Sequence, residues 1–380
     1  MSSHAHVVGW GKYVPQRVLK NGELSELVDT SDEWIRTRTG IRERHLAEDG
    51  ETTASMAFQA ARQALEVAQL SPAQVDLIIV ATATPDHLFP STACLVQDMI
   101  GATRAAAFDL SAGCTGFIYG LSVAANMLSS GAYQTALVIG AETLSSITDW
   151  TDRSTCVLFG DGAGAVVIQM GENKGGVLAA TLGSDGSGGD ILWLPAGGSR
   201  MPTSQQTIDQ RLHFIHMKGR EVFRFAVKVI HEATCEVLQK AGYALSDLTL
   251  LIPHQANQRI IEAAARSLNL PLEMVYSNVE WYGNTSAASI PIALSEAVEK
   301  GRIQTGDLVV CVGFGAGLTW GAVAIRWTRP HSVPVSLSRR ALRRLHYSLA
   351  RFRSRLRRLL RGLFVIWIKN GWNGDQRRHE

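Results

Sequence analysis

A cysteine at position 114 stands in a setting that could turn its thiol into a nucleophile. It follows an apolar stretch, lies among small residues, and precedes apolar residues spaced by three and four, as in a helix. The first turn of a helix exposes unpaired backbone N–H groups and the positive end of the helix dipole. We therefore expect Cys114 at a helix start, with its thiol pKa lowered toward the reactive thiolate.

Two later segments supply polar side chains that could complement such a nucleophile. His254 lies in the sequence PHQAN, directly after an apolar run typical of a buried strand, and Asn284 lies in the turn-like sequence GNTSAAS. Taken singly, the three residues have ordinary explanations: a buried structural cysteine, a core histidine and a helix-capping asparagine. Together, Cys114, His254 and Asn284 are the types needed to accept an acyl group and then stabilise the enolate of a thioester.

The segments that must position these residues form a weak internal duplication. A helical pattern at 54–68 leads through a Leu-Ser turn into an apolar run at 75–81, and a second helical pattern at 222–238 leads through another Leu-Ser turn into 248–253. Apolar strands that alternate with helices indicate sheets covered on both faces, and this length suits two fused halves of roughly 150 residues. Further strands are predicted at 135–140, 163–169, 308–313 and 321–327, and a long surface loop at 183–204.

Composition excludes several classes of protein. The chain has 46% hydrophobic residues and contains neither an apolar run of membrane-spanning length nor an N-terminal pattern typical of a secretory signal. Its five cysteines are odd in number and scattered without a Cys-x-x-Cys pair, which argues against a disulfide framework or a metal site and favours a reducing cytoplasm. These cysteines are Cys94, Cys114, Cys156, Cys235 and Cys311.

The net charge of +3 conceals a strong division between body and tail. Residues 328–380 hold 14 Lys and Arg against 2 Asp and Glu, whereas residues 1–327 hold 23 basic and 32 acidic residues. The tail also repeats apolar residues at alternating spacings of three and four, which predicts a basic amphipathic helix and, across 338–372, contact with an anionic membrane surface. The alternatives are a solvated appendage and contact with an acidic partner protein, and no nucleic-acid partner is expected. The apolar positions are Leu342, Leu345, Leu349, Phe352, Leu356, Leu359 and Leu363.

Six blocks in this order make residues 5–327 resemble β-ketoacyl-acyl-carrier-protein synthase III, the initiating condensing enzyme of type II fatty-acid synthesis in the thiolase-like superfamily. The resemblance implies an α/β fold in which two duplicated halves, 1–174 and 175–327, form a five-layered α-β-α-β-α core, followed by the tail at 328–380. It also implies a cytoplasmic homodimer. The blocks are SDEWIRTRTGI at 31–41, DLSAGCTGF at 109–117, FGDGAGA at 159–165, PHQAN at 253–257, GNTSAAS at 283–289 and GFGAGLTWG at 313–321.

The resemblance implies a decarboxylative Claisen condensation between an acyl-CoA primer and malonyl-acyl carrier protein, with no cofactor and no metal. Cys114 would carry the acyl group, and His254 and Asn284 would donate to the thioester oxygen as malonyl loses CO₂. The N–H groups of Cys114 and Ala316 would form the oxyanion hole. Many relatives have glycine where Ala316 stands, and alanine preserves the N–H unless the backbone there requires a positive φ.

The same resemblance implies several binding positions. Trp34 and Arg153 match residues that sandwich the adenine of coenzyme A, and Arg38 matches one near its phosphates, where stacking and Arg–phosphate pairing are the physical reasons. Phe89 matches a residue that reaches into the acyl pocket of the partner in the dimer. The basic positions that dock the acidic carrier protein are Arg224 and Arg259.

Related activities fit the sequence less well. A degradative thiolase needs a second catalytic cysteine, but the glycine loop aligns Gly313 with that position and leaves Cys311 as a strand residue. A 3-hydroxy-3-methylglutaryl-CoA synthase needs an upstream glutamate, and none lies between Glu66 and Glu142. Chalcone-synthase-like enzymes typically have proline where this chain has Ala316. The alternatives left open are a relative that starts or acylates a secondary-metabolite chain and, outside enzymes, a non-catalytic acyl- or lipid-binding module.

Overall fold

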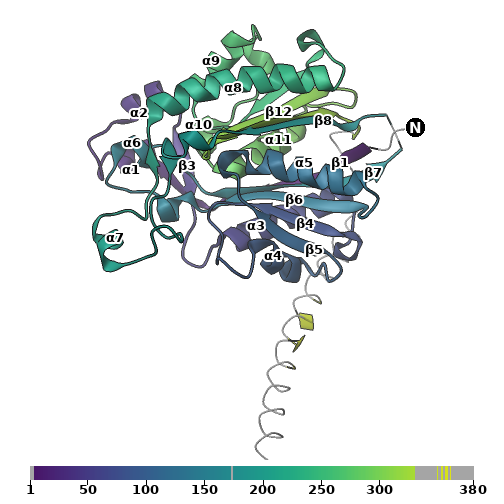
Figure 1. Cartoon of the computed structure of the whole chain (residues 1–380), viewed down its shortest axis with the longest axis horizontal. Helices are drawn as coiled ribbons and strands as arrows, with labels where there is room; N and C mark the ends of the chain where they lie inside the picture. Colours follow the sequence, from purple (N-terminus) through teal and green to yellow (C-terminus); the bar gives the residue numbers. More distant parts are fainter. Residues whose placement is uncertain are drawn as a thin grey trace, which may run out of the picture.

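The computed structural model describes residues 4–172 and 174–329, together with residues 349, 352, 353, 356, 357 and 360. Its main body is built from two β-sheets that face each other across a central pair of helices, with further helices on both outer faces (Figure 1). Three buried apolar clusters lie between successive layers. The chain therefore has five layers in the order α-β-α-β-α, as the sequence predicts.

The first sheet has the strand order β1-β7-β6-β4-β5. Its centre is parallel, since β4 pairs in parallel with both β5 and β6, whereas β7 runs antiparallel to β6 and β1. Helices α3 and α4 cover the outer face and pack against β4, β6 and β7 through small and aliphatic side chains. The bounds are β1 His4–Tyr13, α3 Thr53–Ala68, β4 Leu77–Ala81, α4 Thr92–Ile100, β5 Ala106–Leu110, β6 Thr135–Glu142 and β7 Gly162–Gly171.

The second sheet repeats this plan in the later part of the chain, with the order β11-β12-β13-β8. Strands β11 and β12 are parallel, and β13 runs antiparallel to both β12 and β8. Helices α8 and α9 bury one face each against this sheet, with apolar residues at helical spacing in both. The bounds are β8 Gly176–Ser184, α8 Gly219–Lys240, β11 Leu250–Pro253, α9 Gln258–Ser267, β12 Leu308–Gly315 and β13 Thr319–Arg326.

The central layer consists of α5 (Gly116–Ser129) and α11 (Ser289–Glu299), which contact both sheets. Their close approach depends on missing side chains. A Cβ at Gly140 in β6 would lie 2.1 Å from the carbonyl oxygen of Ala287, and one at Gly164 in β7 would lie 2.6 Å from the backbone nitrogen of Ile292. Both distances are too short for a methyl group, so glycine is required where the 287–292 segment crosses the first sheet.

Most predicted elements are present, with longer or shifted ends. The predicted strands correspond to β4, β6, β7, β11, β12 and β13, and both Leu-Ser turns are 3₁₀ turns, η1 (Pro72–Gln74) and η5 (Leu245–Asp247). The sequence analysis missed β1, β5 and β8, along with the hairpin of β2 (Arg17–Lys20) and β3 (Glu43–Leu46). The edge strand β5 has no fully buried residue, so it lacks the continuous apolar pattern of central strands.

Short elements connect the layers and carry many of the functional positions. They are α1 (Asn21–Leu24), α2 (Asp32–Thr39), η2 (Gly113–Thr115), η3 (Leu144–Ile147), α6 (Arg153–Cys156), η4 (Gly186–Gly188), β9 (Leu192–Trp193), α7 (Gln205–Asp209), β10 (His216–Met217), η6 (Leu272–Met274), α10 (Val279–Tyr282) and η7 (Ser286–Ala288).

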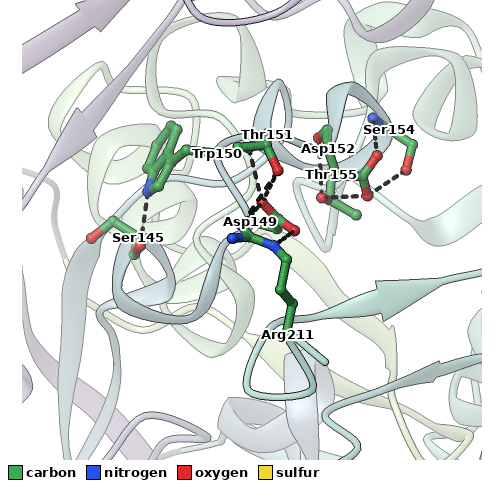
Figure 2. A network of polar contacts seen from close by, with 8 residues as sticks. All are labelled: Ser145, Asp149, Trp150, Thr151, Asp152, Ser154, Thr155 and Arg211. Carbon is green, nitrogen blue, oxygen red and sulfur yellow. Dashed lines mark hydrogen bonds and ion pairs between the residues drawn. The ribbon is translucent and has the colours of Figure 1, made fainter. Parts of the chain in front are cut away.

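The surface loop predicted at 183–204 is part of a longer excursion, residues 185–218, between β8 and α8. This excursion contains α7 and the small β9–β10 ladder. A polar network attaches it to the segment after η3 (Figure 2). The Arg211 guanidinium donates to both carboxylate oxygens of Asp149, at 2.5 and 3.1 Å. The N–H and hydroxyl of Thr151 also donate to Asp149. These donors lower the pKa of Asp149 to about 2, so it remains ionised at neutral pH.

The predicted tail helix lies largely outside the described residues. Leu349, Phe352 and Leu356 are described as helical, as is Leu360, and all four side chains are exposed. The other apolar positions named for this helix are not described. Within the described parts of the chain, no helix combines the length and apolar character needed to cross a membrane.

The Asp149–Arg211 contact yields a prediction about local stability. Arg211→Ala should accelerate hydrogen exchange of the backbone amides in residues 192–217, because it removes the two-point attachment of this excursion while the sheets remain intact. Hydrogen exchange followed by mass spectrometry measures this directly. Arg200→Ala, an exposed arginine of the same excursion outside the network of Figure 2, serves as the control. Equal exchange in the two variants would show that the ion pair does not hold the excursion.

Candidate active site

The three residues singled out by their chemistry line one pocket. Cys114, His254 and Asn284 come from three separate segments and surround a cavity of about 290 Å³ between the two halves. Phe314 and Gly315 at the end of β12 complete its inner wall, and mainly apolar side chains line the way out. The pocket also includes Trp34 and Arg38 from α2. Other lining residues are Leu158, Phe159, Leu192, Met217, Val222, Phe223 and Ile260.

Cys114 occupies the turn that joins β5 to the central helix α5. It lies in η2, a single 3₁₀ turn, and α5 begins two residues later. Only 8% of its surface is exposed. A Cβ at Gly315 would lie 2.6 Å from the Cys114 backbone nitrogen, so the strand end needs glycine to reach this turn. The expected position near a helix start is confirmed, with a 3₁₀ turn in place of the first α-helical turn.

The expectation of a lowered thiol pKa for Cys114 is wrong. Burial, with a smaller contribution from the Glu142 carboxylate, raises the pKa of Cys114 to about 12, although Ser286, which can donate a hydrogen bond to the thiolate, acts in the opposite direction. Desolvation penalises the charged thiolate more than the helix start favours it. The resting nucleophile is therefore a thiol, and it must transfer its proton before or during attack.

His254 follows β11, and its backbone N–H donates to the Val312 carbonyl of the neighbouring strand at 2.8 Å. Its Nδ1 lies 2.6 Å from the Ser289 hydroxyl oxygen, which also accepts from the Gln255 N–H at 3.3 Å. We take the Ser289 hydroxyl as the donor to Nδ1, which places the ring proton on Nε2. Burial lowers the pKa of His254 to about 3, so the ring is neutral. A neutral imidazole with a proton on Nε2 is a hydrogen-bond donor.

The side chain of Asn284 is also oriented as a hydrogen-bond donor. Its side-chain oxygen Oδ1 accepts from the Ser286 N–H at 2.9 Å, which leaves Nδ2 to donate. Its backbone bridges to the first half of the chain, since the Asn284 N–H donates to the Leu158 carbonyl at 2.8 Å and its carbonyl accepts from the Gly160 N–H. The side chain is 7% exposed and lines the pocket. Asn284 and His254 thus present two neutral donors to the cavity that holds Cys114.

The glycine loop lies directly against the nucleophile turn. A Cβ at Gly113 would lie 3.1 Å from the Ala316 backbone nitrogen, so the N–H groups of residues 114 and 316 belong to neighbouring turns. Ala316 has no positive φ, and alanine is therefore accommodated without strain. Alanine can therefore stand at position 316, where many relatives have glycine, because the backbone there does not require a positive φ. Cys311 lies fully buried inside β12, as expected of a strand residue.

The residues expected to bind coenzyme A gather at the pocket entrance. The guanidinium of Arg153 lies 5.0 Å from the centre of the Trp34 ring, and that of Arg38 lies 5.5 Å from it. Arg153 also donates to the Asp29 carbonyl at 2.6 Å. Arg153 and Trp34 contact each other directly here, so an aromatic ring inserted between them would have to part the two side chains.

The two predicted docking arginines line a separate hollow of about 710 Å³ beside the entrance. Arg224 and Arg259 share it with Arg38, which also lines the inner pocket, and Arg259 lies 5.9 Å above the Phe223 ring. The hollow is therefore basic and continuous with the pocket through Arg38. Phe89, by contrast, is 87% exposed and does not line either hollow.

Sequence reasoning did not assign several residues of the site. Ser286 and Ser289 stand inside the GNTSAAS block but look like ordinary small residues, and the pairing of Phe314 with His254, at 5.0 Å between ring centres, joins two distant segments. Glu142 ends the buried strand β6, and in the sequence it marks only the far end of a stretch without glutamate. No group of three or more acidic, histidine or cysteine side chains suited to a metal ion occurs among the described residues.

Comparison with known proteins extends this picture to the whole body. Two family models match the chain: 3-oxoacyl-acyl-carrier-protein (ACP) synthase III over residues 108–186 and its C-terminal counterpart over residues 238–327. The β-ketoacyl-acyl-carrier-protein synthase III of Caldanaerobacter subterraneus subsp. tengcongensis is 55% identical over 325 residues, which cover 86% of this chain and 98% of that protein. The enzyme of the same name from Symbiobacterium thermophilum is 56% identical, covering 85% and 98%.

A solved structure agrees with the sequence relatives. The crystal structure of 3-oxoacyl-acyl-carrier-protein synthase III from Aquifex aeolicus superimposes with a TM-score of 0.79 at 51% identity, covering 85% of this chain and all of that one. The matches thus span the five-layered body and both halves of the pocket. The chain belongs to the β-ketoacyl-acyl-carrier-protein synthase III family, whose members are condensing enzymes of the acyltransferase type.

Proposed function

We propose that this enzyme condenses an acyl-CoA primer with malonyl-acyl carrier protein and so carries out the initiating condensation of fatty-acid synthesis. The observation that carries this proposal is the meeting of a cysteine and two neutral hydrogen-bond donors, from His254 and Asn284, in one buried pocket. Acyl-CoA would serve as a substrate, and no cofactor is invoked. The relatives' names agree with this reaction and do not favour a secondary-metabolite pathway or a non-catalytic lipid-binding module.

In the first half-reaction, the Cys114 sulfur attacks the thioester carbonyl of the primer and forms a new acyl thioester, and coenzyme A leaves with a proton. The neighbouring N–H groups of Cys114 and Ala316 are proposed as the oxyanion hole, because charge develops on the carbonyl oxygen at this step. The apolar lining of the pocket limits water, which would otherwise hydrolyse the acyl-enzyme.

In the second half-reaction, malonyl loses CO₂ and the electrons of the broken bond pass to the thioester oxygen as an enolate. This step needs donors more than a strong base, and a neutral His254 with its proton on Nε2 suits the task better than an imidazolium. The enolate carbon then attacks the acyl group on Cys114, which leaves as thiolate. The product is β-ketoacyl-acyl carrier protein.

The substrate carriers would approach from the basic side of the pocket. Trp34, Arg38 and Arg153 are proposed to bind coenzyme A, and their mutual stacking at the entrance supports this assignment. Arg224 and Arg259 are proposed to dock the acidic carrier protein, since they line the basic hollow beside that entrance.

The larger organisation is proposed from the arrangement of the chain. A boundary at 174/175 separates halves whose sheets use strands up to Gly171 and from Gly176 onward. A homodimer is proposed because Leu88 and Phe89 are more than four-fifths exposed, which is costly for an apolar pair unless a partner covers it. We assign the enzyme to the cytoplasm, with residues 338–372 at a membrane surface.

The nucleophile can be tested by intact-protein mass spectrometry after incubation with acyl-CoA. Cys114→Ala should carry no acyl adduct and make no condensation product, because it lacks the attacking sulfur, while the circular dichroism spectrum stays unchanged. Cys94→Ala, which removes an exposed cysteine, should acylate as the unmodified enzyme does. An acyl adduct on the Cys114→Ala protein would refute the assignment.

The division of labour can be tested by measuring the half-reactions separately. His254→Ala and Asn284→Ala should still take the acyl label from acyl-CoA, because both donors act on the enolate. Each should slow decarboxylation of malonyl-acyl carrier protein about 10²–10³-fold, the usual effect of removing one oxyanion donor. Comparable losses in acyl transfer and decarboxylation would contradict this division.

The membrane role of the tail can be tested by truncation after Thr328. Full-length enzyme should sediment with anionic vesicles at low salt, with binding weakened by added salt, because each basic residue near anionic lipid contributes roughly 1 kcal/mol. The truncated enzyme should stay in solution and condense soluble substrates at an unchanged rate. Failure of the full-length enzyme to bind such vesicles at low salt would exclude a membrane role.

A further inference from the structure

Glu142 is a fully buried carboxylate that the condensation chemistry leaves unused. It ends β6 beneath the nucleophile turn and has no exposed surface. No arginine, lysine or histidine pairs with it anywhere in the part of the chain that the structure describes. A buried carboxylate without a cation is costly to maintain, so its position calls for an explanation.

Neutral donors surround this carboxylate. The Thr84 hydroxyl donates to Oε2 at 2.7 Å, the Thr82 hydroxyl donates to the same oxygen at 3.3 Å, and the Ala83 N–H lies 3.1 Å from it. Both hydroxyls accept from backbone N–H groups, those of Thr143 and Thr84, so their own hydrogens are free to point at Glu142. These donors suit a carboxylate, but burial outweighs them and raises the pKa of Glu142, so the group has a high affinity for a proton.

Ser286 connects this carboxylate to the nucleophile. Its hydroxyl donates to Oε1 of Glu142 at 3.0 Å, and the same side chain lies beside Cys114, where it lowers the pKa of the thiol. The turns η2 and η7 that carry Cys114 and Ser286 pack against each other. Ser286 has a φ of 48°, in the left-handed region that non-glycine residues rarely adopt, and the Asn284 side chain holds its N–H. The hydroxyl is thus fixed between a thiol and a carboxylate.

Few other ionisable groups face this chain of contacts. Strands β4 and β7 and the turn η7 carry none. Helix α3, which packs against β6, carries Arg62 and Glu66, α5 carries Tyr119, β12 carries Cys311, and α11 carries Glu296 and Glu299. The Tyr119 hydroxyl donates to the Gly183 carbonyl, and Glu296 pairs with Lys300. The pocket itself adds Arg38 and the neutral His254.

We propose that Glu142 accepts the proton of Cys114 through the Ser286 hydroxyl. The thiol S–H bond breaks and its proton passes to the Ser286 oxygen, while the hydroxyl proton of Ser286 passes to Oε1 of Glu142. The products are a thiolate, an intact serine hydroxyl that now donates to sulfur, and a neutral carboxylic acid. Glu142 touches no reacting atom of the substrate, so it is a positioning residue that acts through Ser286.

Charge balance explains why this transfer suits a buried site. One negative charge is present before and after the step, so the charge moves from carboxylate to sulfur and no new buried charge is created. Transfer to His254 would instead create an ion pair inside the pocket, against the burial that already disfavours the imidazolium. The donors around Glu142 favour its ionised form against the effect of burial, and attack on the acyl-CoA carbonyl consumes the thiolate.

The proposal rests on Cys114 as nucleophile, but alkylation by iodoacetamide tests it without acyl-CoA or carrier protein. The rate at Cys114 is followed as a function of pH by peptide mass spectrometry, which separates it from Cys94 and the other cysteines. Two groups that share one proton give a thiolate fraction independent of pH between their two macroscopic pKa values. The unmodified enzyme should therefore show a plateau through the neutral range.

Glu142→Gln keeps the size of the side chain but cannot take up the proton. Its plateau should vanish, and the rate should rise about tenfold per pH unit, as for an isolated thiol below its pKa. Ser286→Ala should do the same, and since it removes only one of the hydrogen bonds to Glu142, it covers the case in which Glu142→Gln does not fold. Glu142→Asp should restore a plateau of lower height. Glu296→Gln, another buried carboxylate, is the matched control and should keep the plateau.

Two results would overturn the proposal. If Glu142 acts on Cys114 only by its negative charge, then Glu142→Gln lowers the thiol pKa and alkylation at neutral pH becomes faster. If His254 is the acceptor, the plateau disappears in His254→Ala and persists in Ser286→Ala. A failed test would leave the role of Cys114 as acyl carrier intact, because that role is measured by acyl adducts and not by the pH profile.

Discussion

The close packing of backbone turns at the seam between the two sheets is the constraint on which the rest of the site depends. The Cys114 turn contacts the end of β12 because residue 315 is glycine, and the Ser286 turn contacts β6 because residue 140 is glycine. These approaches bring groups from both halves within hydrogen-bonding distance. A methyl group at either glycine would force the layers apart by distances that a tightly packed interior cannot absorb. The active site is therefore a consequence of how the two halves pack.

Burial at this seam determines the chemistry of the side chains. It keeps Cys114 as a thiol and His254 as a neutral donor, so neither residue rests in the charged form often assigned to a cysteine–histidine pair. The serines at positions 286 and 289 then act as the local polar partners of these two groups. Neutral donors suit an enolate, whose charge appears only during the reaction, because they avoid a permanent buried cation. The low polarity of the pocket thus favours the second half-reaction. In the first half-reaction it makes removal of the proton from the Cys114 thiol more difficult.

The outer part of the site has a different character. Its arginines are exposed or stacked on aromatic rings, and the excursion at 185–218 supplies Leu192 and Met217 to the pocket wall. The Asp149–Arg211 pair anchors that wall to the loop that leads into α6, which begins at Arg153 (Figure 2). The wall is therefore attached to the same chain segment that carries Arg153, one of the proposed coenzyme A contacts. A large, flexible substrate can be held by such surface contacts while the buried end remains rigid.

The fold class, the duplication and the three pocket residues could be predicted from local pattern and from the short motifs around Cys114, His254 and Asn284. Edge strands, the return path of the long excursion and the roles of Ser286, Ser289 and Glu142 depend on contacts between segments far apart in the chain. Only the tertiary structure decided the ionisation of Cys114, because desolvation is a property of the folded surroundings. A helix start can be predicted from neighbouring residues, but the depth at which that helix is buried cannot.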